Sequence, residues 1–525
     1  MLSFGRYFRT IRYIKPVQAY YRLRYSILPG RKRIKIPEKY SINSFRNSYF
    51  ISPPALSPVS YKSGNIFEFL NLQKKFKDRI DWNYDGYGKL WNYNLNYFDY
   101  LHQPGMNVDE GIYLIEDYCR NIPDIKNGLK PYPLSLRCFN WIKFLINNQI
   151  DDDSINRCLW AQFSHLKNNL EYHLLANHIL ENGFALLYGS LYFDDKRLYN
   201  DAKRILTREL EEQILSDGGH FELSPMYHQS VLGRLLDCIN LIGSEPTIAD
   251  DLLRLMQNKT AYMIGWLRHI TFNDGNIPLL NDSARGIAPH TNRLIKYAEN
   301  LEINKIDVDL GDSGYRKISG EKFECVIDVG HIGPDYQPGH AHADTFTFEL
   351  YVENRPFIVD RGTSTYEPGE RRSIERGTGA HNTVLCHNEN SSEVWSSHRV
   401  GRRAYVTVED ERAGYIKATH NGYKHKGTFH TRSFEFHGNQ MVITDTITEK
   451  NKAIEHEAFL HFHPDITLHI EDLKVTSNIK AGINFTGANA IHVIPYEYAP
   501  EFNSLIRAQC LRITFTHRLT AIFDF

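Results

Sequence analysis

Residues 339–351 read GHAHADTFTFELY, and apolar residues alternate with polar ones in the second half of this stretch. The alternation predicts a half-buried β-strand, because successive side chains of a strand point to opposite faces. The Glu-Asn-Arg of residues 353–355 indicates a turn, and residues 356–360 are predicted to return beside the first strand as a hairpin. This stretch therefore places its part of the chain in an antiparallel β-structure.

Four polar residues around the hairpin form a candidate metal site. His340 and His342 are two residues apart, so an extended chain would point both imidazoles to the same face. Asp360 ends the return strand, and His381 opens the next strand-like run. Imidazole nitrogen and carboxylate oxygen are ligands that zinc takes in tetrahedral sites. The alternative is that these are ordinary polar residues of a solvated sheet edge.

The rest of the chain divides into a helical part and a β-rich part. Between about residues 65 and 310, apolar positions recur at helical spacing, and no strand-like alternation of any length is evident. The clearest helical stretches are residues 109–121, 135–148, 154–189, 196–215, 229–242 and 248–270. After about residue 317, short alternating runs bounded by Gly, Asn and Asp are typical of an antiparallel sandwich.

These patterns predict a chain of three parts. Its 525 residues exceed what one hydrophobic core usually supports. We expect a basic N-terminal segment over residues 1–60, an α/α toroid over residues 61–312 and an antiparallel β-sandwich over residues 313–525. The Gly-Asp-Ser-Gly of residues 311–314 is typical of a linker between the last two.

Composition and charge narrow the classes of function. The net charge of −1 gives no global signal for nucleic acid, so positive contacts to an acidic ligand must be local. The seven cysteines are scattered without paired spacing, which argues against a disulfide framework and fits a reducing compartment. Because no transmembrane span or secretory signal is evident, we expect a cytoplasmic protein, with the periplasm as the alternative if a signal has been removed.

The N-terminal segment combines apolar and basic residues. Phe4, Phe8, Ile11 and Ile14 recur at helical spacing, with arginines and a lysine between them. A basic amphipathic helix of this kind can lie on an anionic membrane surface. It can equally pack on its own protein with its charges in water, which is the interpretation that the sequence favours.

Within the helical part, the first stretch of interest is residues 132–141. Ser135 is placed to cap a helix on which Arg137, Asn140 and Trp141 would lie about one turn apart. An arginine beside an aromatic ring suits an acidic sugar, since the guanidinium can hold a carboxylate while the ring stacks on the sugar. An interhelical polar contact beside a core tryptophan explains the same residues equally well.

Two further stretches place polar groups where a cleft could form. Asn177, His178 and Glu181 lie close together on an otherwise apolar helix, which indicates a cavity wall because buried polar groups need partners. Residues 216–228 form a glycine-rich loop between helices, and such a loop can position side chains over a cleft. Tyr227 is predicted to open the helix that follows.

These motifs together resemble the heparinase II/III-like polysaccharide lyases. The resemblance spans roughly residues 90–470 and rests on residues 177–193, the ELSPMYH of residues 222–228, the HAHAD motif, residues 360–363 and residues 380–383. The Tyr-Phe-Asp-Tyr of residues 97–100 is also similar to family members encoded with bacterial capsule or O-antigen synthesis genes. The resemblance implies an α/α toroid followed by an antiparallel β-sandwich, and cleavage of uronic-acid-containing glycans by β-elimination.

The resemblance also implies roles for individual residues. Elimination needs a group that neutralises the uronate carboxylate, a base for the C5 proton and an acid for the leaving oxygen. Tyr227 matches the acid and a candidate base, His340 matches the second acid or base, and Asn177, His178 and Glu181 match the carboxylate-side helix. The implied zinc ligands are His342, Asp360 and His381, and we interpret that zinc as structural because elimination needs no metal-bound water. The substrate-binding candidates are Arg137, Asn140, Trp141, Glu222 and His228.

Two other functions stay open on sequence alone. A glycoside hydrolase needs two carboxylates, which Glu181 with Glu222 or Asp217 could supply. A non-catalytic glycan-binding or assembly protein of surface-polysaccharide biosynthesis is the other alternative, although the intact Tyr227 and His340 argue against it. Sulfated glycans usually need a dense Lys/Arg surface, so a bacterial capsular or O-antigen polysaccharide with a uronic acid is a better expectation than heparin.

Overall fold

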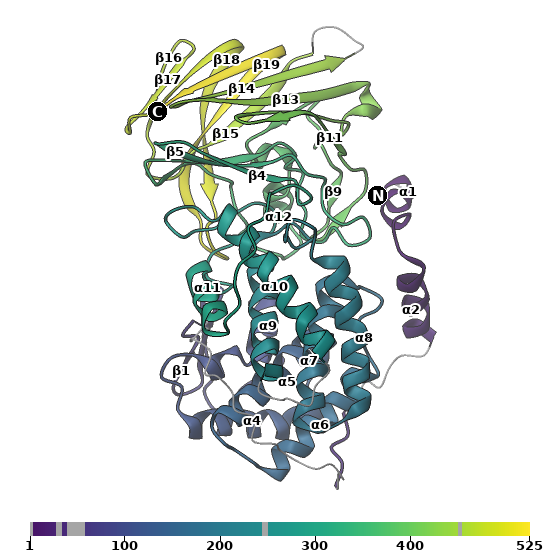
Figure 1. The fold of residues 1–525 in the computed structure, drawn as a ribbon. Coiled ribbons are helices and arrows are strands. Elements are labelled where there is room, and N and C mark those ends of the chain that lie inside the picture. Colours follow the sequence, from purple (N-terminus) through teal and green to yellow (C-terminus); the bar gives the residue numbers. More distant parts are fainter. Residues whose placement is uncertain (1–3, 28–33, 39–57, 244–249, 450–453) are drawn as a thin grey trace.

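The computed structural model describes residues 4–27, 34–38, 58–243, 250–449 and 454–525. A helical domain lies below a β-sandwich, and two short N-terminal helices lie at the side of the molecule (Figure 1). The predicted order of an α/α toroid followed by an antiparallel β-sandwich is confirmed.

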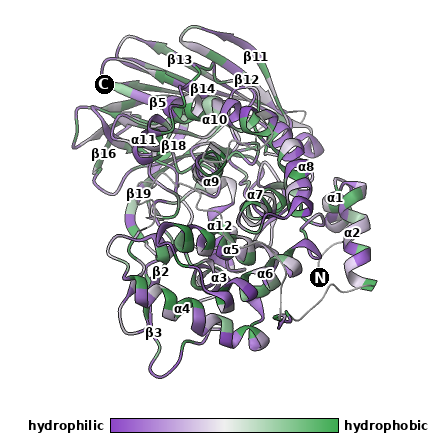
Figure 2. Cartoon of the chain, turned by 60° about the horizontal axis from the view of Figure 1, so that its bottom comes forward, coloured by the Kyte–Doolittle hydropathy of each residue, from purple (hydrophilic) through white to green (hydrophobic). Residues whose placement is uncertain are grey.

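The toroid is built from helices α3 to α11. They are α3 (Lys89–Tyr97), α4 (Val108–Asn121), α5 (Pro131–Asn147), α6 (Asp153–Lys167), α7 (Ala176–Tyr192), α8 (Lys196–Gln213), α9 (Pro225–Gly243), α10 (Asp250–Ile270) and α11 (Thr291–Asn300). Helices α5, α7 and α9 are buried on nearly every face and pack side by side, whereas α4, α6 and α8 bury only part of their surface and cover them (Figure 2). A helix that is apolar all round needs a neighbour on every side, so the composition of each helix decides which layer it joins.

Two details of the helical part differ from the sequence prediction. The stretch 154–189 is two helices, α6 and α7, separated by residues 168–175. The toroid also begins with a small antiparallel sheet of β1 (Tyr61–Lys62), β2 (Ile66–Phe69) and β3 (Leu72–Lys75), so the expected absence of strands was wrong. Strands of two to four residues are too short to show a measurable alternation.

The sandwich consists of two antiparallel sheets. The smaller has the order β4 (Tyr315–Ser319), β5 (Phe323–Asp328), β6 (Phe348–Val352) and β7 (Arg355–Ile358). The larger has the order β11 (Val406–Arg412), β12 (Tyr415–His420), β13 (Thr428–His437), β14 (Gln440–Glu449), β19 (Ile506–Asp524), β18 (Gly482–Tyr498), β17 (Lys474–Ser477) and β16 (Leu468–Glu471), with β15 (His456–His461) between β19 and β8 (Val384–Leu385). Phe348 of the smaller sheet packs edge-on against Phe434 and Phe523 of the larger one, which closes the core between them.

Several shorter elements join these layers. They are α12 (Glu370–Glu375), the ribbon of β9 (Val394–Trp395) and β10 (Arg399–Val400), and the 3₁₀ turns at Asp99–His102, Ile122–Asp124, Asn127–Leu129, Thr378–Ala380 and Lys424–Lys426. All seven cysteines are free. Within the part of the chain that the structure describes, no helix is both long enough and apolar enough to cross a bilayer.

The predicted hairpin is present as β6 and β7, which turn at Glu353 and Asn354. The prediction of a half-buried strand was wrong, because every residue of β6 is buried. Its second face is covered by the toroid, where Tyr351 stacks on Phe272 with ring centres 3.8 Å apart. The strand therefore joins the two domains, and the HAHAD motif lies in the loop that enters it.

The N-terminal helices α1 (Phe4–Ile11) and α2 (Pro16–Ile27) pack on both domains. Arg9 of α1 binds Glu393 of the sandwich with two bonds of 2.7 and 2.8 Å. Gln18 of α2 donates to the Leu174 carbonyl of the toroid at 2.9 Å. The segment therefore packs on its own protein, as predicted. The predicted orientation of α1 is wrong, because its arginines face the protein and Phe8 is exposed to solvent. The predicted segment boundary at residue 60 lies beside residues 39–57, which are outside the described residues.

Candidate active site

A cavity of about 460 Å³ opens where the toroid meets the loops that lead into the sandwich. Five of the predicted site residues line it: Asn177, His178, Glu222, Tyr227 and His340. Its wall also contains three tyrosines of the toroid, Tyr93, Tyr97 and Tyr132. Residues from five separate segments of sequence thus meet in one cavity.

The centre of the cavity is a stack of Tyr227 on His340. The two ring centres are 3.8 Å apart and the planes differ by 28°. Tyr227 lies in the first turn of α9, as predicted, and the Ser224 hydroxyl accepts its backbone N–H at 3.3 Å. Burial raises the pKa of Tyr227, and the carboxylates of Asp282 and Glu222 add to the effect. At neutral pH the phenol is therefore protonated and can donate.

His340 is held from one side by a buried carboxylate that the sequence analysis missed. Asp282 Oδ2 lies 3.1 Å from His340 Nδ1, and Asp282 Oδ1 lies 2.8 Å from His342 Nε2. Arg372 donates to both oxygens of Asp282, at 2.5 and 2.7 Å. Burial alone would raise the pKa of Asp282, but the Arg372 guanidinium outweighs it and holds the pKa well below its usual range. An ionised Asp282 favours a proton on Nδ1 of His340 and leaves Nε2 as the basic nitrogen.

Glu222 holds His340 from the other side. Its Oε2 lies 3.2 Å from His340 Nε2, while its Oε1 accepts the backbone N–H of Asn177 at 3.0 Å. Burial raises the pKa of Glu222, although His340 opposes the shift. Glu222 therefore joins the imidazole to the start of α7, and it can share a proton with Nε2.

Residues with a strained backbone adjoin these side chains. Leu175 and Ala176, with φ of 63° and 53°, precede Asn177 at the start of α7. Leu223 has a φ of 58° directly after Glu222, and Asn281 has a φ of 56° directly before Asp282. Left-handed backbone is costly for a leucine, and such strain clusters at functional sites where the surroundings impose it.

His178 forms part of the wall beside Asn177. Its Nδ1 lies 3.2 Å from Glu171 Oε1, and its ring centre lies 4.9 Å from that of Tyr132. Burial alone would lower the pKa of His178, but the Glu171 carboxylate outweighs it and raises the pKa. A cation at this position would suit an anionic ligand group.

Two of the predicted substrate-binding residues lie in the core instead. Arg137 is fully buried, donates to Gln162 and to two backbone carbonyls, and lies over the Tyr118 ring. Trp141 is equally buried and packs edge-on against Tyr118. Ser135 does not cap the helix, because α5 begins four residues earlier at Pro131. Helical spacing placed these residues on one face correctly, but that face packs against other helices.

His228 and Glu181 are also absent from the cavity wall. His228 is buried against Trp266, its Nε2 lies 3.0 Å from the Met263 carbonyl, and burial lowers its pKa to about 3. Glu181 lies 3.7 Å from Arg234, and burial raises its pKa to about 7. Neither residue is among those that line the cavity beside Tyr227.

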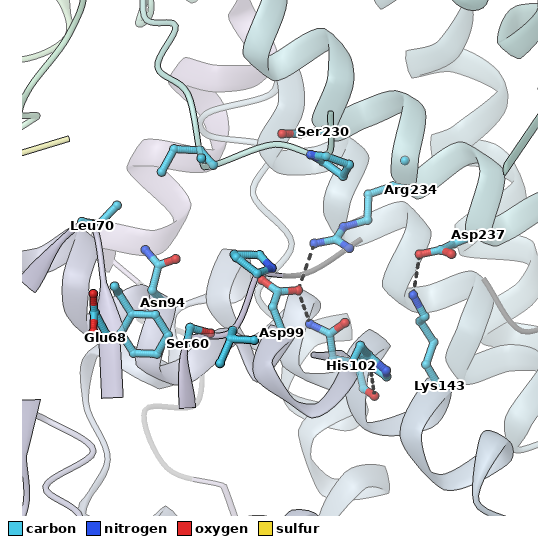
Figure 3. A pocket seen from close by; sticks show the side chains of 18 of the residues that line it. Ser60, Glu68, Leu70, Asn94, Asp99, His102, Lys143, Ser230, Arg234 and Asp237 are labelled. Carbon is cyan, nitrogen blue, oxygen red and sulfur yellow. Dashed lines mark hydrogen bonds and ion pairs between the residues drawn. The ribbon is translucent and has the colours of Figure 1, made fainter. Parts of the chain in front are cut away.

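A second cavity of about 260 Å³ lies further along α9 and is lined by paired charges (Figure 3). Asp99 lies 3.5 Å from Arg234 and accepts the Asn140 amide at 2.7 Å. Lys143 binds Asp237 at 2.7 Å. Asn140, predicted to contact substrate, thus lines this cavity and not the one around Tyr227.

The predicted zinc ligands lie near one another without forming a metal-binding group. The rings of His342 and His381 are 5.3 Å apart, and His381 Nδ1 is 2.7 Å from Asp360 Oδ2. No three His, Cys, Asp or Glu side chains of the described residues are arranged to hold a metal ion. However, His342 Nδ1, His381 Nε2 and Asp344 Oδ2 are buried without a hydrogen-bond partner in the described part of the chain. These are donor atoms that zinc takes, and Asp360 is placed to orient His381.

Comparisons with known proteins agree with this architecture. A profile of the heparinase II/III N-terminus matches residues 134–303, and one of the heparinase II/III-like C-terminal domain matches residues 302–521. A heparin-sulfate lyase of Pedobacter heparinus is 27% identical over 249 residues, which cover 41% of this chain and 36% of the relative. A heparin-sulfate lyase of Bacteroides stercoris is 22% identical over 344 residues, which cover 60% and 50%. The chain thus matches half or less of the length of these relatives.

A solved structure of heparinase III has the same fold. It superposes with a TM-score of 0.66 over 96% of this chain and 88% of that one, at 15% identity. At this identity the likeness concerns the fold, while chemistry has to be argued from the residues themselves.

Proposed function

Since the chain belongs to the heparinase II/III-like family, we propose that it is a polysaccharide lyase that cleaves a uronic-acid-containing glycan by β-elimination. The observation that carries the proposal is the stack of Tyr227 on His340 in a cavity that Asn177 also lines. These three side chains supply an acid, a base and a neutral donor for a carboxylate, which are the three functions that elimination needs.

The acid is assigned to Tyr227. In the reaction a base removes the C5 proton, a double bond forms between C4 and C5, and the bond from C4 to the glycosidic oxygen breaks. The leaving oxygen then takes a proton from the Tyr227 hydroxyl. The raised pKa of Tyr227 keeps that hydroxyl protonated at neutral pH, so the residue enters the reaction in the form that an acid requires.

The base is assigned to the pair of His340 and Glu222. Asp282 orients the imidazole through Nδ1, so the proton that enters the pair is taken up at Nε2 or by Glu222 Oε2, 3.2 Å away. The raised pKa of Glu222 makes it a better proton acceptor than an ordinary carboxylate. Because Tyr227 stacks on the same imidazole, acid and base lie on one side of a bound sugar.

The uronate carboxylate is assigned to the start of α7. The Asn177 side chain and the His178 ring both line the cavity there. An amide donor and an imidazole with a raised pKa would stabilise the negative charge that develops as C5 loses its proton. The N-terminal end of the helix dipole acts in the same direction.

The charges around the cavity favour a substrate with few sulfates. Lys89 is the sole Lys or Arg among the residues that line the cavity around Tyr227, as far as the structure describes them. In the second cavity, Arg234 and Lys143 each already face a carboxylate. A densely sulfated chain needs several free cations, whereas a singly charged uronate among neutral sugars could stack on the three tyrosines. We therefore propose a lightly charged acidic polysaccharide, such as a bacterial capsular or O-antigen glycan.

Zinc remains part of the proposal. Asp360, which the resemblance gave as a ligand, already bonds His381 Nδ1, so we propose Asp344 in its place. His342, His381 and Asp344 would hold the zinc through their unpartnered buried atoms, with Asp360 orienting His381. Bound there, it would stabilise the loop that carries His340 and would supply no group to the reaction. Metal analysis of the purified protein, compared with His381→Ala, tests this assignment, and equal zinc content in the two proteins would contradict it.

The lyase proposal is tested by incubating the protein with a panel of uronic-acid polysaccharides. The ultraviolet absorbance of the unsaturated uronate that elimination produces is then measured over time. We expect Tyr227→Phe to lower the rate by about 10³-fold, since it removes the proton donor but keeps the ring. Tyr93→Phe is the matched control, because it removes a hydroxyl from the same cavity and should change the rate by less than about tenfold. An absorbance rise that persists in Tyr227→Phe would contradict the assignment of the acid.

The same experiment separates the alternatives. Cleavage without absorbance would indicate hydrolysis, although the predicted carboxylate pair does not favour it: Asp217 accepts the backbone N–H of Ser313 at 2.9 Å and, like Glu181, does not line the cavity. No cleavage of any polysaccharide would favour a glycan-binding or assembly protein. The expected cytoplasmic location remains a prediction.

A further inference from the structure

Helices α1 and α2 present an unusual concentration of exposed apolar side chains. Of the nineteen large hydrophobic side chains exposed in the described residues, six lie on these two helices: Tyr7, Phe8, Ile11, Tyr20, Leu23 and Ile27. We call this set the N-terminal apolar face. Phe8 is 63% exposed, Leu23 61% and Ile27 66%. Figure 2 shows both helices at the edge of the molecule, with green, apolar segments on them.

The helices are attached through ion pairs as well as aromatic contacts. Arg6 and Arg9 both bind Glu393, and Lys15 pairs with Glu212 and lies over the Tyr336 ring. On a surface helix the apolar residues normally face the protein and the charged ones face water. Here ion pairs face the protein together with Tyr7, which packs on Trp395, and Tyr21, which packs on Tyr172. Phe8, Ile11, Leu23 and Ile27 are instead left largely exposed.

The exposed residues form continuous stripes. Phe8 and Ile11 are three residues apart on α1, and Tyr20, Leu23 and Ile27 recur at spacings of three and four on α2. Such spacings place side chains on one face of a helix. A stripe of this kind suits contact with an extended apolar surface better than binding of a small molecule.

The sequence of the N-terminal segment is strongly positive. Residues 1–37 contain ten Lys or Arg and no Asp or Glu, in a chain whose net charge is −1. Arg12 and Arg24 are exposed and directly follow Ile11 and Leu23 in sequence. Neither forms an ion pair within the residues that the structure describes. Arg12 contacts Tyr13 and Arg24 lies over the Tyr21 ring, so each borders a stripe with a charge that no carboxylate of the described residues offsets.

We propose that the N-terminal apolar face docks the protein on an anionic lipid membrane. The apolar side chains would enter the boundary between headgroups and acyl chains, and the bordering arginines would contact lipid phosphates. A second copy of the chain is a poorer partner, because pairing two such faces would bring their cations together. The proposal concerns a membrane surface and is independent of the reaction assigned to the cavity.

Docking would place the cavity beside the lipid. Gln18 of α2 donates to the backbone carbonyl of Leu174, and the Leu174 side chain lines the cavity. The enzyme would therefore meet its polysaccharide close to the membrane surface. A soluble polysaccharide should still reach the cavity, because none of the six residues of the apolar face lines it.

The test is sedimentation of the full chain with two kinds of vesicles, one of phosphatidylcholine and one of equal parts phosphatidylcholine and phosphatidylglycerol. We expect binding to the anionic vesicles only, weakened by added salt. The double variant Phe8→Ser with Leu23→Ser should bind at least about tenfold more weakly, because two apolar anchors are lost. Leu505→Ser is the matched control, since Leu505 is 46% exposed and lies outside the N-terminal apolar face, and it should bind like the wild type.

Each other outcome would overturn the proposal. Equal binding of the wild type and the double variant would mean that the apolar face does not meet the lipid. If neither binds, and light scattering shows that the wild type is a dimer and the double variant a monomer, the face is a contact between copies. Thermal unfolding of each variant shows that it is folded, and cleavage of soluble polysaccharide by the double variant should equal that of the wild type.

Discussion

Two buried networks in this molecule have nearly the same chemistry. At the cavity, Asp282 binds Arg372 with two bonds and faces His340 and His342. Inside the sandwich, Asp445 binds Arg432 with two bonds of 2.7 and 2.8 Å and faces His430 at 2.6 Å. In both, the aspartate has a lowered pKa because an arginine outweighs its burial.

The two networks differ in what lies beyond the histidine. His340 lines the cavity and carries Tyr227 on its face. His430 lies 3.0 Å from His420, and both are fully enclosed. An aspartate, arginine and histidine network is thus no mark of an active site by itself. Access of the imidazole to a cavity is what separates a network that positions a reacting group from one that holds two strands together.

The largest effect is expected from Asp282→Asn. The change keeps the shape of the side chain but replaces an acceptor near His340 Nδ1, so the imidazole loses the partner that fixes its tautomer. We expect kcat to fall by about 10³-fold, as is typical when an orienting carboxylate is lost. Ultraviolet absorbance measures the rate, and thermal unfolding shows how much protein is folded. A variant with normal kcat would remove His340 from the proposed chemistry.

The next effect is a loss of stability without a loss of rate. Asp445→Asn leaves Arg432 buried without a countercharge, and breaking a buried ion pair costs about 3–5 kcal/mol. Denaturant unfolding should show this loss, while kcat per folded molecule should stay within about twofold of the wild type. A drop in kcat as large as that of Asp282→Asn would mean that the two networks are not separate in function.

The sequence predicted those parts of the site that depend on local patterns. The HAHAD motif, the hairpin after it and the first turn of α9 are each defined within a few residues, and all were placed correctly. Asp282 was missed because it meets His340 from 58 positions away in the chain, and Arg372 because it meets Asp282 from 90 positions away. The nearest signal was the polar Asn281-Asp282-Ser283 directly after the apolar residues 277–280, which places a carboxylate at the end of a buried run.

The errors share one physical cause. Helical periodicity tells which residues share a face, but it does not tell what covers that face. Arg137 and Trp141 were grouped correctly and yet face the core, and Phe8 was assigned to an apolar face that the protein leaves exposed. In each case a partner distant in sequence decides which way the side chain points. Gln162 accepts a hydrogen bond from the Arg137 guanidinium, and Glu393 binds arginines of α1 on the side that faces the protein.

The smallest expected effect is a loss, at acid pH, of the unfolding free energy that the Asp445 carboxylate contributes. Because its pKa is lower in the folded protein than in the unfolded chain, the stabilisation is fully present above a pH of about 4 and is lost as the pH falls toward the folded value. The difference in unfolding free energy between wild type and Asp445→Asn should therefore shrink by at most about 1.4 kcal/mol per pH unit below pH 4.

Histidines also change the stability at acid pH, and His430, which faces Asp445, affects the difference between the two proteins. Burial lowers the pKa of His430 and of His420, so protonation of the unfolded chain weakens both proteins as the pH falls through about 6.5. The loss at His420 is largely common to wild type and variant, but the loss at His430 is not, because the Asp445 carboxylate raises the His430 pKa in the wild type. The comparison is therefore made in a His430→Gln background, where only the group at position 445 differs between the two proteins. Denaturant unfolding at several pH values between 6 and 3 measures the difference directly. A constant difference across this range would show that the Asp445 carboxylate is not the group that Arg432 stabilises.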